Sequence, residues 1–445
     1  MRPEHRQAAT AQRRASRFGH VLRRLALLAC AGVSAAVGHA AAEPPAAEPP
    51  AAGPAPLPAG EATPATAGHP AISLLTVGPG DIYFERFGHN AIVVRDPASG
   101  EALAYNYGMF DFSEAHFLAN FVRGHMTYQL AANALDADLA QYRAEGRSVE
   151  EQVLDLAPAQ AQRLVAFLEW NALPENARYR YDYFSANCST RVRDALDRAL
   201  GGALLAQSEG RSRGYTYRLD ALRLMAPEPA LMLLIDLGLG PYADRRIDFW
   251  DESFVPETLA AVVARARIGA DAQPLVTTTR ELAANHVAVP PALPPDLRWP
   301  FLGLGIGLGL GLHWLARRQA CAARIGLATF AVVFESLCGL GGIALLYLWL
   351  GSDHVAAWRN ENLLLLSPLC LLLVPGWIGH ARGRRARGGT RTLAWLVVAG
   401  ALFALASKIL PWFPQANLHW IVLLLPIHLA LALALGGATG RTPRQ

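Results

Sequence analysis

Lysine and charge are scarce in this chain of 445 residues. Lysine and arginine together number 40, but Lys408 is the only lysine, and charged residues make up 17% of the sequence against 52% hydrophobic residues. The glycine-rich run 303–311 therefore lacks the lysine of a nucleotide-binding phosphate loop, and no strand precedes it. In an apolar stretch such glycines favour close helix packing. No pattern indicates a metal site, a cofactor or nucleic-acid binding, and a mean hydropathy of +0.20 points to a membrane protein.

Cysteine is scarce as well. Four of the five cysteines lie in or next to long apolar stretches, at Cys30, Cys321, Cys338 and Cys370. Cys188 is alone in the region 70–295, which excludes a disulfide framework within that region. In an oxidising compartment a lone thiol is a liability unless the protein uses it.

The first 42 residues have the order of a secretory signal. Seven arginines precede an apolar run from Leu25 to about Val37, and the alanines at 40–42 offer a cleavage site of small residues. A lipoprotein signal ending at Cys30 is an alternative, and an uncleaved segment would act as an anchor with the same topology. Residues 43–69 are rich in proline and alanine, which predicts an extended linker.

Five apolar stretches in the last third are each long enough to cross a bilayer. They cover about 299–316, 325–350, 363–380, 393–410 and 418–437, and residues 438–445 form a short tail. Arginines cluster after the first, third and fifth stretches, whereas the other two loops contain only Arg359. By the positive-inside rule the arginine-rich loops are cytoplasmic, so the region 70–295 is periplasmic. We therefore predict an α+β periplasmic domain followed by an all-α bundle of five transmembrane helices in the inner membrane.

Cys188 is expected at the start of a helix. Apolar residues recur at helical spacing from Val192 to Leu200, Gly201 supplies a stop, and Ser185 or Asn187 can cap the start. At such a position the helix dipole and unpaired backbone N–H groups favour a thiolate and lower the pKa of the thiol. We therefore predict that Cys188 is a nucleophile.

His89 is the best-placed candidate for the base that a cysteine nucleophile needs. It opens the run 91–94, which predicts a strand, and a strand holds the backbone of a general base in place. The same region also contains His69, His116, His125 and His286. A second strand is predicted at 102–107, where Asn106 would lie beside the first and could orient the imidazole, although Tyr105 or Tyr107 are alternatives.

The order of histidine on a strand and cysteine at a helix start about a hundred residues later resembles the circularly permuted branch of the papain-like fold. That branch includes the lecithin:retinol acyltransferases and some NlpC-like enzymes. More specifically, five stretches resemble the periplasmic domain of the Lnb-type lipoprotein N-acyltransferases: GDIYFERFGHNAIVVRD, YNYGMFDF, FVRGHMTYQL, ANCSTRVRDAL and LGLGPYADRRIDFWDESFVPETL. The stretch SDHVAAWRNENLLLLSPL resembles the membrane part of the same family.

This resemblance implies an acyl transfer at the outer face of the inner membrane. A membrane phospholipid would give an acyl chain to Cys188, with His89 as the base, and the amino group of a diacylglyceryl lipoprotein would receive it. The backbone N–H of Cys188 is a natural donor to the oxyanion, and Tyr181, Tyr183 or Asn187 could provide another. A thioester suits this route because it yields readily to an amine.

Four polar residues between the second and third apolar stretches match the Asp-His and Asn-x-Asn of the family's membrane part. They are Asp353, His354, Asn360 and Asn362. The resemblance implies that they meet the phospholipid head group or the lipoprotein, and a solvated polar loop is the alternative. Glu335 lies within the second stretch and needs a partner or a wet cavity, but the pattern assigns neither.

Two other classes of function remain open. Cys188 and His89 would also suit an amidase or peptidase acting on cell-wall peptide, or a phospholipase, although five spans exceed what a soluble polymer substrate requires. A non-catalytic membrane sensor would leave the lone thiol unexplained.

Overall fold

The computed structural model describes residues 69–110 and 116–436. The predicted signal, nearly all of the predicted linker and the predicted tail lie outside these residues. The described chain forms two compact units: the first has residues up to Pro295 together with Ser352–Ala356, and the second has Asp296–Gly351 and residues from Ala357 onward.

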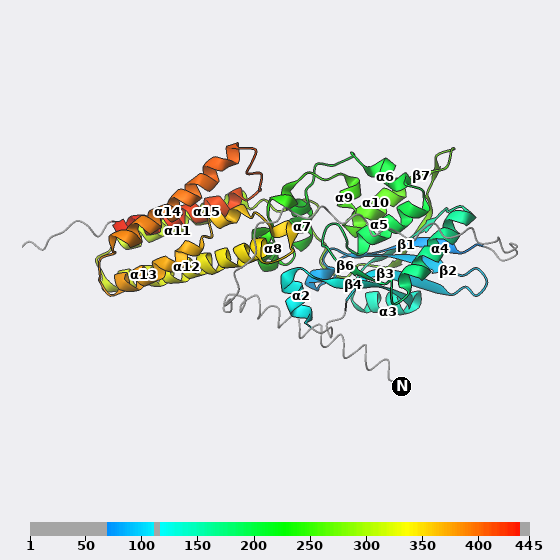
Figure 1. Cartoon of the computed structure of the whole chain (residues 1–445), viewed down its shortest axis with the longest axis horizontal. Helices are drawn as coiled ribbons and strands as arrows, with labels where there is room; N and C mark the ends of the chain where they lie inside the picture. The colour runs from blue at the N-terminus through cyan, green and yellow to red at the C-terminus, as the bar shows by residue number, and fades with distance from the viewer. Residues whose placement is uncertain (1–68, 111–115, 437–445) are drawn as a thin grey trace, which may run out of the picture. The chain divides into compact units, whose positions relative to one another are not determined.

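A seven-stranded sheet, antiparallel throughout, forms the centre of the first unit (Figure 1), in the order β6-β4-β3-β2-β1-β5-β9. Its strands are β1 (Ala71–Val77), β2 (His89–Arg95), β3 (Ala102–Met109), β4 (Thr127–Ala134), β5 (Val149–Leu154), β6 (Arg178–Arg180) and β9 (Val276–Ala283), and β7 (Arg267–Ile268) pairs separately with β8 (Gln273–Pro274). The predicted strands 91–94 and 102–107 lie within β2 and β3. They pair with Ala91 opposite Asn106, so the prediction of neighbouring strands is confirmed.

Helices cover both faces of the sheet because apolar side chains alternate along its strands. On one face Ile72 and Leu74 pack with α4 (Pro158–Ala172), α5 (Cys188–Ala199) and α10 (Pro256–Arg265). On the other face Leu75 and Val77 pack with α3 (Leu135–Ala144). Figure 1 shows α5 and α10 on one side of the sheet and α3 on the other. The unit is therefore an α/β layered domain.

Short helices complete the first unit: η1 (Tyr83–Glu85), α2 (Phe117–Arg123), α6 (Ala203–Ser208), α7 (Tyr217–Met225), α8 (Pro229–Gly238), η2 (Pro241–Asp244) and α9 (Phe249–Glu252). The buried guanidinium of Arg218 ties several of them together. It pairs with Asp236 and Asp244 and donates to the carbonyls of Leu239 and Gly240. A buried charge is stable only when it is paired and hydrogen-bonded, and this arginine is both.

The second unit is all-α, as predicted. Its long helices are α11 (Arg298–Ala316), α12 (Cys321–Leu350), α14 (Gly388–Ala406) and α15 (Leu418–Gly436), joined by η3 (Val355–Ala357), η4 (Glu361–Leu364), η5 (Pro368–Leu373), α13 (Val374–Ala381) and η6 (Ser407–Ile409). Within residues 69–110 and 116–436, four helices are long and apolar enough to cross a membrane, or five if one bent pair counts as a single span.

The third apolar stretch is not the continuous helix that we predicted over 363–380. It consists of η4, η5 and α13, with a bend of 41° between 355–364 and 368–381. Pro368 and Pro375 each stand at the start of one of these short helices. Proline lacks the N–H that a continuing helix would need and restricts the residue before it, which explains the break.

Hydrogen bonds within the second unit show which of its loops lie at the same end of the bundle. Arg324, in the first turn of α12, donates to the carbonyl of Ala381 at the end of α13, 3.3 Å away. The arginine-rich loops beside these two residues therefore share one end of the bundle. Elsewhere Glu361 pairs with Lys408 and accepts a hydrogen bond from the backbone N–H of Gln415, so the two arginine-poor loops meet each other. This pairing is the one expected if the bent segment crosses the bilayer.

Candidate active site

Cys188 is the first residue of α5, as predicted, and Asn187 is the cap. The side-chain oxygen of Asn187 accepts from the Thr190 N–H at 2.9 Å. Its amide nitrogen donates to the carbonyls of Phe254 at 2.8 Å and Tyr183 at 3.1 Å. Both donors are engaged by backbone, so the geometry gives no support to Asn187 as an oxyanion donor.

The start of α5 packs against a bulge of β3, where β3 pairs with β4. The register shifts between Asn106 and Met109, and Gly108 there has φ +85°. A Cβ on Gly108 would lie 3.1 Å from the Cβ of Cys188, closer than such atoms normally approach. The hydroxyl of Ser189 lies 2.8 Å from Oδ1 of Asn90 and ties the helix to β2. Glycine at this bulge therefore makes room for the cysteine.

His89 is the first residue of β2, and three hydrogen bonds determine how its ring is held. Nε2 of His89 lies 2.9 Å from Oδ1 of Asn106. The Asn106 amide nitrogen donates to Oδ2 of Asp138 at 2.7 Å and to the carbonyl of Ala104 at 3.1 Å. Because the amide nitrogen faces these acceptors, Oδ1 must face the imidazole and Nε2 must carry the proton. Nδ1 of His89 then keeps a free lone pair, which is what a general base needs.

Burial controls the protonation of the two candidate catalytic groups. Burial lowers the pKa of His89 to about 4, the Asn106 hydrogen bond opposes this fall, and the nearby cation of Arg147 adds to it. Burial also raises the pKa of the Cys188 thiol, and the backbone N–H groups of Asn90 and Ser189 lower it by less. Both groups are therefore neutral at pH 7. The predicted lowering of the thiol pKa is wrong, because desolvation outweighs the helix start.

Cys188 and His89 approach each other through Asn90. The backbone N–H of Asn90, the residue after His89, is among the groups that stabilise the Cys188 thiolate. Within the described residues, no hydrogen bond joins the sulfur directly to the imidazole. Catalytic contacts are often long in the free enzyme and tighten when substrate binds.

The other predicted histidine candidates lack such a setting. His69 and His286 are exposed, and His116 is an exposed residue at the start of α2. His125 pairs with Asp353 at 2.8 Å. None of these four has the amide and carboxylate support that His89 has among the described residues.

Tyr181 and Tyr183 belong to a chain of rings in contact, some stacked and some edge to face, which we call the aromatic row. Its members are Phe84, Phe110, Tyr128, Tyr181, Tyr183 and His354, with neighbouring ring centroids between 4.1 and 6.0 Å apart. Burial, and after it the nearby Cys188 sulfur, raises the pKa of Tyr181 well above its usual range. The aromatic row therefore passes the thiol.

Helix α2 lies along the aromatic row. Phe117 stacks on Phe110 and Phe121 contacts His354, each with ring centroids 6.2 Å apart. Leu118 and Val122 point away from these contacts and are 46% and 43% exposed. A helix this short with apolar side chains on both faces indicates a surface that meets something apolar.

The structure separates the four polar residues between α12 and η5. Asp353 accepts from His125 and Arg180, each at 2.8 Å, and His354 stacks on Tyr183, so both belong to the first unit beside the aromatic row.

Asn360 and Asn362, in contrast, are buried in the second unit. Oδ1 of Asn360 accepts from the backbone N–H of Asn362 and from Gln415, and Oδ1 of Asn362 accepts from Asn417. The exposure that head-group binding requires is absent for these two side chains.

Asp138 is the residue that sequence reasoning missed. It stands on α3 with Leu135, Leu139 and Tyr142 at helical spacing, and all four are buried. A carboxylate inside an apolar helix stripe is a signal of a buried polar contact. Asn133 donates to its other oxygen at 3.0 Å, so this carboxylate is anchored from two sides.

Comparison with known families agrees with this division of the chain. Residues 65–227 match the model of the Lnb N-terminal periplasmic domain, and residues 312–436 match the model of the Lnb transmembrane domain. No curated protein and no solved structure matches the chain. The two matches together cover more than half of the sequence and contain Cys188, His89, Asn106 and Asp138. The chain therefore belongs to the Lnb family of lipoprotein-maturation enzymes, as a membrane protein with a periplasmic domain.

Proposed function

We propose that this protein transfers an acyl chain from a membrane phospholipid to the amino terminus of a diacylglyceryl lipoprotein, through a thioester on Cys188. The observation that carries the proposal is the hydrogen-bonded series Asp138–Asn106–His89, which leaves Nδ1 unprotonated on the residue next to Asn90 at the thiol. In this proposal Cys188 and His89 are the catalytic residues, and Asn106 and Asp138 are positioning residues.

In the first step Nδ1 of His89 accepts the thiol proton while the sulfur attacks the carbonyl carbon of a phospholipid ester. Backbone N–H groups at the start of α5 stabilise the oxyanion. The bond from this carbon to the glycerol oxygen breaks, and His89 returns the proton to that oxygen. The products are a lysophospholipid and acylated Cys188.

In the second step the neutral amine of the lipoprotein attacks the thioester carbon. His89 takes a proton from the attacking nitrogen, the C–S bond breaks, and the sulfur recovers the proton. The product is an amide at the lipoprotein amino terminus, and the enzyme returns to its starting state. Neutral thiol and neutral imidazole suit this route because the proton moves as each bond forms.

The surroundings of the thiol support a lipid substrate. The aromatic row beside Cys188 leads to α2 with its exposed Leu118 and Val122, a surface suited to acyl chains. Arg180 and His125 are more than half exposed and stand beside Asp353, where a phosphate could meet them. We therefore retain Tyr181, Tyr183, Asp353 and His354 as substrate contacts and no longer include Asn187, Asn360 or Asn362.

The decisive experiment is detection of a long-chain thioester. The full-length protein in proteoliposomes should gain one acyl mass on Cys188, and hydroxylamine should remove it. In cells depleted of their usual lipoprotein N-acyltransferase, expression should add one acyl chain to lipoprotein amino termini, detected by mass spectrometry. Cys188→Ala should do neither, while Cys321→Ala, which removes an exposed thiol of the second unit, should do both.

Other outcomes would assign the protein differently. Free fatty acid with lipoproteins left diacylated would make it a phospholipase. Cleaved cell-wall peptides without a long-chain acyl group on Cys188 would favour the amidase interpretation. Either result would reject the transferase proposal while leaving Cys188 as a nucleophile.

A further inference from the structure

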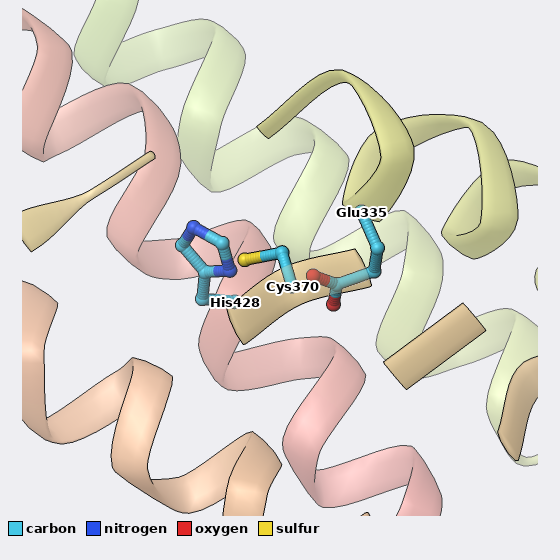
Figure 2. Close-up of side chains that lie close together, drawn as sticks. All are labelled: Glu335, Cys370 and His428. Atoms are coloured by element: carbon cyan, nitrogen blue, oxygen red, sulfur yellow. The ribbon is translucent and has the colours of Figure 1, made fainter. Parts of the chain in front are cut away.

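Three ionisable side chains from three separate segments converge inside the second unit. Glu335 of α12, Cys370 of η5 and His428 of α15 are all buried, with 2%, 0% and 2% of their surface exposed. A carboxylate oxygen, the sulfur and a ring nitrogen all lie within 4.8 Å of one another. Figure 2 shows the three side chains pointing toward a common point between their helices.

The backbone is built for this convergence. A Cβ on Gly339 or Gly342, one and two turns after Glu335 on α12, would overlap Leu371 or the carbonyl of Leu366. The two glycines let the bent segment come against α12, which brings Cys370 to the carboxylate. The close approach lies at the break of the third apolar stretch, because Leu366 stands between η4 and η5.

The hydrogen bonds around the cluster leave electron pairs unused. Nε2 of His428 lies 3.0 Å from the carbonyl of Leu365, so Nε2 carries the proton and Nδ1 has a free lone pair. One oxygen of Glu335 accepts a hydrogen bond from the Cys370 thiol. The other oxygen, Oε2, is buried with no hydrogen-bond partner among the described residues. A buried carboxylate oxygen without a partner is costly, most of all in a membrane protein.

We propose that Glu335, Cys370 and His428 bind one divalent zinc ion. Thiolate, imidazole and carboxylate are each zinc ligands, and three protein ligands leave the fourth tetrahedral position open. The Leu365 carbonyl that holds Nε2–H is the kind of outer contact that orients a metal-binding histidine. On binding, the Cys370 thiol loses its proton. The charge of zinc then cancels those of the thiolate and the carboxylate, which a low-dielectric interior favours.

This site is independent of the acyl-transfer proposal, and it differs from our expectation from the sequence, in which no pattern indicated a metal site. A bound zinc ion would be the partner that Glu335 needs inside an apolar helix. It also fastens α12, the bent segment and α15 to one another, because each of the three contributes one ligand.

The test is metal analysis of the full-length protein, purified in detergent with a tag that lacks histidine. After exposure to zinc and removal of free metal, the wild type should hold about one zinc per chain. Cobalt in its place should give a thiolate-to-metal absorption band. Cys370→Ser should lower zinc affinity by at least about tenfold. Cys338→Ser is the matched control, because Cys338 is an equally buried thiol on α12 outside the cluster.

A second measurement needs no variant that might fail to fold. In the zinc-loaded wild type, alkylation of Cys370 followed by peptide mass spectrometry should be slow and should become faster when a chelator is added. The proposal is overturned if the wild type retains no zinc above the level of Cys370→Ser, or if the chelator leaves Cys370 alkylation unchanged.

Discussion

The low pKa of His89 makes a quantitative prediction about acylation at acidic pH. If the neutral imidazole is the base and its pKa is about 4, roughly 97% of the enzyme is competent at pH 5.5. An ordinary histidine with a pKa of about 6.5 would leave only about 9% competent at the same pH. The rate of acylation of Cys188 should therefore stay nearly constant from pH 7.5 to 5.5 rather than fall about tenfold.

The assay is rapid quenching followed by intact-protein mass spectrometry, with an activated short-chain ester as the acyl donor. This donor reports on the thiol and the base whatever the natural substrate is, and no amine is needed. Tryptophan fluorescence recorded in parallel would verify that the protein stays folded. A half-maximal rate near pH 6.5 would refute the reasoning, because it would mean that His89 is not desolvated or is not the base.

The lowered pKa of His89 also makes the folding stability depend on pH. The folded-state pKa is depressed, so neutral His89 contributes stability that is complete above about pH 6.5 and is lost as pH falls toward 4. Between pH 7 and 4.5 the loss from this group is at most about 2.5 kcal/mol, an upper bound because the ring is only half-buried. His89→Gln should lose less stability than the wild type over this interval in urea unfolding.

Two further predictions concern the membrane topology and the bulge of β3 at Gly108. A reporter fused after Gly388 should be cytoplasmic and one fused after Pro414 periplasmic, because the arginine-rich loops share one end of the bundle. A periplasmic signal at Gly388 would instead mean that the bent segment is a re-entrant loop. Gly108→Ala and Gly100→Ala should each cost about 1 kcal/mol of stability, because both glycines have positive φ. Only Gly108→Ala should slow acylation of Cys188, by at least about tenfold, since nothing lies within 4 Å of a Cβ at the other glycine. Equal rates would show that the bulge does not position the thiol.

Most of the fold was predictable because local signals agree with tertiary packing. The composition of the run 91–94, the helical spacing after Cys188 and the length of the apolar stretches each gave a clear signal, and the structure has a strand, a helix and a helical bundle there. The bent third stretch was not predictable from hydropathy. Its two prolines were visible, but only the packing of η5 against glycines of α12 explains why a break is stable there.

Site residues on neighbouring strands could be predicted from the sequence, whereas a contact from a distant helix could not. Asn106 was placed beside His89 by counting along two strands, and the structure shows the hydrogen bond. Asp138 reaches the same amide from a helix on a later part of the chain, which no spacing rule connects to β3. The thiol pKa was also beyond the sequence, because a helix start is a local feature whereas burial depends on the whole domain.

The place of residues Ser352–Ala356 in the sequence determines when the first unit can be completed during synthesis. They supply Asp353 to Arg180 and His125, and His354 to Tyr183, yet ribosomes produce them only after α11 and α12. The periplasmic domain can thus be exported and largely folded while its last contacts are still missing. Completion waits until α12 has been inserted and the following loop has been translocated. Incompletely inserted chains therefore lack these contacts beside the aromatic row, so the integrity of the site depends on successful membrane assembly.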